Sequence, residues 1–201
     1  EHFNGIRMEN VSYGYKGRSK ALQNLSLTVP KGFVIALVGL SGCGKSTTAS
    51  LLMRFCDASA GHIYMEGKDY HSMKPEELRK HIVMVPQQVN LFSGTIRENL
   101  LLADPDADDQ TLMEAVKEAG LLKFVQSLEK GLNSDVGNAG ASLSGGQRQK
   151  IGIARALLSK AEYMIFDEAT SSVDPESEKE IWETIGHLAH TRTLIIISHR
   201  M

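Results

Sequence analysis

Four short runs of apolar residues stand out along the chain. They lie at 33–38, 82–85, 163–166 and 194–197. Polar residues hardly interrupt them, which is typical of strands that are buried on both faces, as in a parallel sheet. We therefore expect these runs to form buried strands of one sheet.

Between these runs, apolar residues recur at the three- and four-residue spacing of a helix that buries one face. The positions with this spacing are Ala49, Leu52, Met53 and Cys56; Leu112, Ala115, Val116 and Ala119; Ile151, Ala154 and Leu158; and Ile181, Trp182 and Ile185. Gly120 is a good C-cap for the second helix, and Asp174-Pro175 is a good start for the fourth. Strands that alternate with helices predict a parallel α/β core.

Two segments depart from this alternation. From Ile6 to Val29, apolar and polar residues alternate on both sides of 16–18 (Lys-Gly-Arg), which predicts an antiparallel hairpin. From about Pro105 to Leu143, the pattern is mostly helical with polar faces. The predicted fold is therefore α/β, with a mostly parallel sheet, an N-terminal antiparallel β subdomain and an inserted α-helical subdomain.

The segment 39–46, GLSGCGKS, matches the phosphate-loop pattern G-x-x-x-x-G-K-[ST] in full. Glycines allow backbone N–H groups to converge on phosphate oxygens, and the helix that follows points its positive end at them. Lys45 is suited to neutralise the β- and γ-phosphates, and the Ser46 hydroxyl to bind Mg²⁺. The segment predicts the core of a P-loop NTPase; the alternative is a glycine-rich turn with an incidental lysine.

Polar residues follow two of the predicted strands. Asp167 and Glu168 come directly after the run at 163–166, and His199 follows the run at 194–197. Ligands bind at the carboxyl ends of parallel strands, so the two carboxylates should face the phosphate loop. One acid can hold Mg²⁺, directly or through water, and the other can orient or deprotonate an attacking water. His199 is suited to contact a γ-phosphate, although a histidine at a strand end is often structural.

The sequence LSGGQ at 143–147 resembles the signature motif of the ABC ATPases, and it stands in that family's order between the phosphate loop and the carboxylate pair. Gln87 resembles the family's Q-loop glutamine, and Asp174 resembles its D-loop aspartate. His199 resembles the switch histidine. The stretch LFSGTIREN at 91–99 is similar to one that is typical of exporter-type nucleotide-binding domains.

The resemblance implies an ATP-binding domain that hydrolyses ATP with Mg²⁺ and powers export across a membrane. Its catalytic residues would be Glu168 as general base, His199 on the γ-phosphate, and Lys45. Its metal ligands would be Ser46, Gln87 and Asp167. The residues that it implies for nucleotide binding are Tyr15 (stacked on adenine), Gly39, Ser41, Gly42, Cys43, Gly44, Lys45, Ser46, Thr47, Gln87, Ser144, Gly145, Gly146 and Gln147. The alternative for Tyr15 is an ordinary strand aromatic, and the alternative for Gln87 is a surface amide.

The resemblance also implies partners. Residues 144–147 would complete the nucleotide site of a second copy in a head-to-tail dimer, either a homodimer or a pair of half-transporters. Transmembrane domains would precede Glu1 in the same polypeptide, which places the domain at the cytoplasmic face of the cell membrane. Family members continue beyond the switch histidine, so we expect the cassette to extend past Met201. Asn138 departs from the glutamate that exporters often carry at this point.

Within a single ABC ATPase domain at 1–201, we expect three subdivisions. Residues 1–32 would form the antiparallel β subdomain, 33–88 and 148–201 the α/β core, and about 89–147 the Q-loop and helical subdomain.

The composition excludes or disfavours several classes of protein. Of the 201 residues, 42% are hydrophobic and 23% are charged, which excludes a disordered chain. The net charge of −2 argues against nucleic acid as a partner. Cys43 and Cys56 are too few for a disulfide framework. No apolar run approaches the roughly 18–20 residues of a membrane-spanning helix.

Two other functions remain open from the residues. One is a soluble ABC ATPase that works on nucleic acid or ribosomes. The slightly negative net charge disfavours this function. The short spacing between the phosphate loop and the signature motif also disfavours it, because it leaves no room for a long coiled coil. The other is a different phosphate-loop enzyme, such as a small-molecule kinase, which LSGGQ and His199 disfavour. The transported substrate is not encoded here, because selectivity lies in membrane segments.

Overall fold

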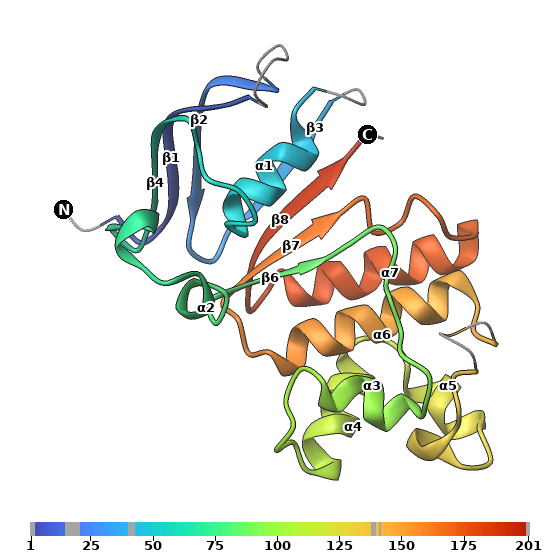
Figure 1. Cartoon of the computed structure of the whole chain (residues 1–201). Helices are drawn as coiled ribbons and strands as arrows, with labels where there is room; N and C mark the ends of the chain where they lie inside the picture. Colours follow the sequence, from blue (N-terminus) through green and yellow to red (C-terminus); the bar gives the residue numbers. More distant parts are fainter. Residues whose placement is uncertain (1–2, 15–20, 40–42, 138–139, 141, 200–201) are drawn as a thin grey trace. The chain divides into compact units, whose positions relative to one another are not determined.

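The structure is a computed structural model of the chain, and Figure 1 shows its elements. It describes residues 3–14, 21–39, 43–137, 140 and 142–199. The chain forms two compact units, which are Glu1–Met84 with Glu162–Glu168 and Ala189–Met201, and Val85–Ala161 with Ala169–Leu188. The subdomain bounds expected from the sequence stay a prediction.

An antiparallel sheet in the first unit has the strand order β2-β1-β4-β5, of which Figure 1 labels β1, β2 and β4. Strands β1 (Gly5–Tyr13) and β2 (Leu22–Pro30) form the predicted hairpin, and β4 (Ala60–Met65) pairs with the other side of β1. The two-residue β5 (Lys68–Asp69) completes the sheet. The sequence pattern missed β4 and β5, because β4 is interrupted by Gly and His and β5 is too short to show alternation.

A parallel sheet in the first unit has the order β3-β8-β7-β6. Its strands are β3 (Val34–Val38), β6 (Ile82–Val85), β7 (Tyr163–Asp167) and β8 (Thr193–Ser198), so every predicted run becomes a strand. Strands β7 and β8 are buried as expected.

The expectation that 33–38 is buried on both faces is wrong. Phe33 is 61% exposed and Val38 is 50% exposed. Exposed and half-buried residues alternate along β3, so one face of this strand is left uncovered by the described residues, within which β3 pairs with β8.

Helix α1 (Lys45–Leu52) follows the phosphate loop and packs its apolar side into the core of the first unit. Ala49 and Leu52 are buried as predicted, but the helix ends before Cys56, which is half-buried and lies outside it. The helical spacing continued past the point where the chain turns at Arg54, which has a φ of 53°. The unit also contains the short helices η1 (Tyr70–Ser72) and α2 (Pro75–Leu78).

The second unit is helical. Its elements are α3 (Ile96–Leu101), α4 (Asp109–Glu118), α5 (Leu122–Ser127), η2 (Gly131–Asn133), α6 (Gly145–Leu158) and α7 (Pro175–Leu188). Helix α6 packs against α3, α4 and α7. Several of these helices begin where a side-chain oxygen accepts from a first-turn N–H, as Asp174 does from Ser177 at 3.0 Å. The predicted C-cap, Gly120, follows α4 with a φ of 78°.

The predicted buried face of α7 is correct at Ile181 and Ile185 but wrong at Trp182, which is 38% exposed. The buried stripe runs through Ile181, Thr184, Ile185 and Leu188, so a small polar residue takes a position in the stripe and the tryptophan lies beside it. Among the helices of the described residues, none combines the length and the apolar character that a bilayer crossing needs.

Candidate nucleotide-binding site

The phosphate loop connects β3 to α1. Gly44 is the N-cap of α1 and has a φ of 96°, in the left-handed region that favours glycine. A Cβ there would also lie 2.9 Å from a methyl carbon of Leu22. Because Gly44 has no side chain, it leaves the helix N-terminus open to an anion. The predicted residues Ser41 and Gly42 lie outside the described residues, as does Tyr15.

Lys45 turns back over its own loop. Its Nζ donates a hydrogen bond to the carbonyl oxygen of Gly39 and lies 3.7 Å from Sγ of Cys43. Ser46 and Cys43 are exposed, whereas Thr47 is half-buried. The loop therefore places an ammonium and a hydroxyl at the start of α1, at the carboxyl end of β3.

Asp167 is the last residue of β7, and Glu168 follows it with a φ of 53°. The Glu168 N–H donates to the carbonyl oxygen of Ile197 in β8, at 2.9 Å. Burial raises the pKa of Asp167, the charge of Glu168 raises it further, and the positive charge of Lys45 acts in the opposite direction. The carboxylate of Asp167 thus lies within electrostatic reach of the phosphate-loop lysine.

His199 lies against Glu168. The distance from Nδ1 of His199 to Oε2 of Glu168 is 2.5 Å. This contact fixes the orientation of the carboxylate and leaves the second imidazole nitrogen available for another group. The first unit therefore brings Lys45, Asp167, Glu168 and His199 to the carboxyl ends of β3, β7 and β8, which are neighbours in the sheet. The sequence predicted these residues at strand ends but not the order of the strands, and their catalytic roles stay a prediction.

The other predicted residues belong to the second unit. Gln87 follows β6, and its Nε2 donates to Oγ of Ser172 at 3.2 Å. Ser172 was not predicted as a site residue. The available signal was its place in the SSVD stretch, two positions before Asp174.

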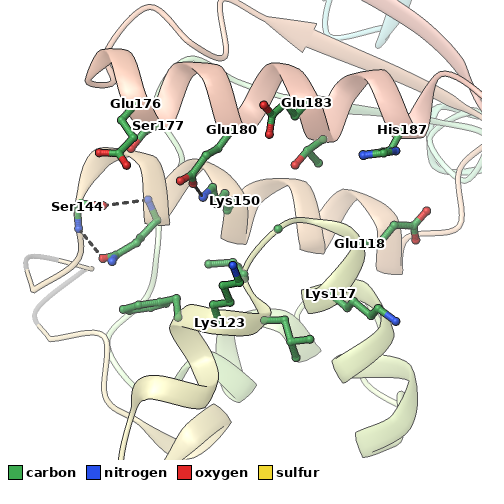
Figure 2. Close-up of a pocket in the computed structure, with 16 residues that line it drawn as sticks. Lys117, Glu118, Lys123, Ser144, Lys150, Glu176, Ser177, Glu180, Glu183 and His187 are labelled. Atoms are coloured by element: carbon green, nitrogen blue, oxygen red, sulfur yellow. Dashed lines mark hydrogen bonds and ion pairs between the residues drawn. The ribbon is translucent and has the colours of Figure 1, made fainter.

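The signature motif forms the start of α6. Ser144 is the N-cap, and Figure 2 shows its reciprocal bonds with Gln147. The Gln147 N–H donates to Oγ of Ser144 at 3.1 Å, and the Ser144 N–H donates to Oε1 of Gln147 at 2.9 Å. Ser144 is exposed, so this capped N-terminus is presented on the surface of the unit.

The glycines of the signature motif allow the start of α6 to lie close to the segment 172–177. A Cβ on Gly146 would lie 2.6 Å from Cβ of Ser177, and one on Gly145 would lie 3.3 Å from the carbonyl oxygen of Ser172. Side chains at these positions would push the start of α6 away from the segment 172–177.

A pocket of about 730 Å³ opens beside the motif, between the α4–α5 turn, α6 and α7 (Figure 2). Its lining includes the carboxylates of α7, the lysines of the α4–α5 region, and a pair between Lys150 and Glu180. Charges of both signs therefore line it. The N-terminus of α6 lies at one end, where Ser144 and Gln147 contribute to the lining.

The chain matches a family model described as ABC transporter over residues 22–171. It belongs to the ABC transporter family. It is 48% identical over 200 residues to the ABC-type transporter kk1G of Curvularia clavata, a match that covers 98% of this chain and 15% of that protein. It is 43% identical over 198 residues to the ATP-dependent lipid A-core flippase of Haemophilus influenzae, with coverages of 98% and 34%.

A solved structure described as a bacterial Atm1-family ABC exporter with ATP bound superposes with a TM-score of 0.90 at 37% identity, covering 98% of this chain and 34% of that one. The predicted fold class and the resemblance to an exporter-type nucleotide-binding domain are thereby confirmed. This ABC domain spans about 15% to 34% of the length of these relatives.

The close approach at Gly146 leads to a stability prediction. Gly146→Ala should destabilise the ABC domain by about 1–3 kcal/mol, because Ser177 must move or the helices must separate. Gly186→Ala is the matched control: it lies inside α7, where an added Cβ meets nothing within 4 Å. It should stabilise the domain by about 0.5–1 kcal/mol through helix propensity. Urea unfolding measures both, and equal effects would contradict the packing described.

Proposed function

We propose that this chain is the ATP-hydrolysing domain of an ABC exporter, which converts ATP and water into ADP and phosphate. The observation that carries the proposal is that Lys45 of the phosphate loop lies within electrostatic reach of Asp167, and that the next residue, Glu168, has its carboxylate 2.5 Å from His199. A binding module would need the lysine and the loop, but it would not need an oriented proton acceptor.

The described residues fit Mg²⁺. This cation prefers oxygen ligands, which Ser46 and Asp167 supply. The half-buried carboxylate of Asp167, whose pKa is raised by burial, suits a place where a cation compensates its charge. Gln87 is the third proposed ligand: its Nε2 donates to Ser172, which leaves the amide oxygen as an acceptor. When bound, Mg²⁺ would neutralise charge on the β- and γ-phosphates.

Each reacting residue has a defined role in the proposal. Lys45 and the loop amides hold the phosphates. Glu168 accepts a proton from a water molecule, whose oxygen forms a bond to the γ-phosphorus while the bond to the leaving ADP oxygen breaks. His199 orients Glu168 through Nδ1 and contacts the γ-phosphate through its other nitrogen.

The finer proposals concern assembly. A second copy of the domain would supply residues 144–147 to each nucleotide, and transmembrane domains in the same polypeptide would carry out export from the cytoplasmic face of the membrane. The names of the relatives, a transporter, a flippase and an exporter, support export over work on nucleic acid.

The test is phosphate release from MgATP by the protein in its full natural length. We expect steady turnover, and we expect Lys45→Ala to weaken nucleotide binding at least tenfold, because a charge-assisted contact to phosphate is lost. Lys68→Ala, at an exposed lysine of β5, should change neither quantity. Absence of turnover in the unsubstituted protein, or full activity of Lys45→Ala, would contradict the proposal.

A further inference from the structure

Gln149 is a polar side chain buried in the second unit. It lies in α6, two residues beyond the signature motif, and exposes 4% of its surface. Buried amides are expected to be hydrogen-bonded, since an unpaired one is costly. The contacts of this amide therefore indicate what it does.

The Nε2 of Gln149 donates to two backbone carbonyls. One is that of Pro86 at 3.2 Å, and the other is that of Ala169 at 2.6 Å. Pro86 immediately precedes Gln87, the proposed metal ligand. Ala169 immediately follows Glu168, the proposed general base. One amide group thus fixes the backbone next to two residues of the proposed reaction.

The first of these segments lies along one face of α6. After Gln149 comes Gly152, where an added Cβ would lie 2.5 Å from Cγ2 of Val89, and then Arg155, whose Nη2 donates to the carbonyl oxygen of Asn90 at 2.6 Å. These three helix positions are spaced three apart, so they share a face. The segment 86–90 is held by this face along its length.

The segment that begins at Ala169 needs support because of the backbone conformation of Glu168, the residue before it. Glu168 has a φ of 53°, which is unfavourable for a residue with a side chain and persists only where neighbours hold it. Its own N–H is held by Ile197, and the carbonyl of the next residue is held by Gln149. The amide of Gln149 therefore supports the turn through which the chain leaves the proposed base.

The surroundings of the amide oxygen of Gln149 indicate that this side chain does more than fill space. Oε1 of Gln149 is buried and has no hydrogen-bond partner among the described residues. The side chain lines a cavity of about 330 Å³, which Gln87 and Ser172 also line. An apolar residue would fill this position without leaving an acceptor unpaired, so the two donated bonds are the feature that the amide contributes.

We propose that Gln149 is a positioning residue. It ties the segment that carries Gln87 to the segment that follows Glu168, both within the second unit, and so holds the backbone next to the metal ligand and the backbone next to the base. The bond between Gln87 and Ser172 joins the same two segments at the level of side chains. This inference rests on the proposed function and adds to it a residue that touches neither nucleotide nor metal.

The experiment replaces the amide in the protein of full natural length. Gln149→Leu keeps the approximate volume and removes the donor. We expect kcat to fall by about 10–100-fold, as for small misplacements of reacting groups, and the half-saturating Mg²⁺ concentration to rise several-fold. ATP affinity should stay within about twofold, because the phosphate loop is untouched. Without nucleotide or metal, amide hydrogen exchange should accelerate in 86–90 and 169–173.

Gln126→Leu is the matched control. It makes the same chemical change at an exposed glutamine of α5 and should leave kcat, the Mg²⁺ response and hydrogen exchange unchanged. A merely structural role for Gln149 would lower the folded fraction but not kcat per folded molecule. Gln149→Asn keeps the amide and is one methylene too short to span both carbonyls, so it should show the same changes in milder form, even where the leucine variant fails to fold.

The outcomes separate the two proposals. If the unsubstituted protein hydrolyses ATP and folded Gln149→Leu or Gln149→Asn matches it in kcat, Mg²⁺ response and hydrogen exchange, the inference is overturned and the proposed function stands. If the unsubstituted protein does not hydrolyse ATP, both are overturned. The selective loss of kcat and of the Mg²⁺ response, with ATP affinity retained, supports the inference.

Discussion

Glu168→Gln is expected to abolish nearly all ATP turnover while ATP affinity stays within a few-fold of the unsubstituted protein. Glutamine has the shape of glutamate and can keep a contact with His199, but it cannot accept a proton from water. Loss of a general base costs about 10²–10⁴-fold in rate. Phosphate release under saturating MgATP measures the rate, and equilibrium binding of a labelled nucleotide measures the affinity.

The control is Glu162→Gln, which makes the same change just before the other end of β7. Glu162 pairs with Lys31 at 3.4 Å on the surface, and exposed pairs contribute about 0–1 kcal/mol to stability. This variant should therefore retain turnover. Normal turnover in Glu168→Gln would assign the base to another residue.

The sequence was sufficient to predict the part of the site that is set by the succession of strand, loop and helix along the chain. A strand followed by a glycine-rich loop and a helix fixes where Lys45 and Ser46 lie, because chain connectivity leaves little choice. Parallel strands bring their carboxyl ends to one edge, and so Glu168 and His199 were predicted at the same edge of the sheet, although the sequence did not predict that β7 and β8 are neighbours. Their contact at 2.5 Å agrees with this reasoning.

The features that were missed depend on what packs against a residue. Periodicity placed Trp182 in the buried stripe and Cys56 inside α1, and neither is there, because neighbouring elements and a turn at Arg54 decide these positions. Gln149 was missed because a polar residue in a helix pattern predicts an exposed position. In the structure it is buried, since segments far away in the sequence cover it.

A second large effect is expected on the oligomeric state of the domain, which should change from monomer to dimer when ATP binds. The phosphate loop and the signature motif each present a helix N-terminus, and they belong to different units of the chain. In the proposed two-fold dimer, each ATP would lie between the phosphate loop of one copy and residues 144–147 of the other. Without ATP, Lys45 and the exposed amides have no phosphate to share, so the domain should be monomeric.

With ATP, Glu168→Gln should dimerise, because hydrolysis no longer reopens the pair. Adding Ser144→Arg should block this dimer by placing bulk at an exposed N-cap that would face the γ-phosphate. The substitution also removes the capping oxygen, which is worth about 1 kcal/mol to helix stability. Adding Ser144→Ala instead removes the same oxygen without the bulk, and it should still dimerise at higher ATP concentration through the remaining backbone N–H groups.

Light scattering distinguishes these cases directly. The measurement uses the ATP-binding domain without transmembrane segments, extended to its natural C-terminus. It compares Glu168→Gln with and without ATP, and then each double variant at saturating ATP. A Glu168→Gln protein that stays monomeric in saturating ATP would contradict the shared site. Dimerisation of the Ser144→Arg double variant would contradict it as well, since an arginine side chain and a γ-phosphate site cannot occupy the same contact. Loss of the dimer in both double variants alike would instead attribute the effect to the cap of α6.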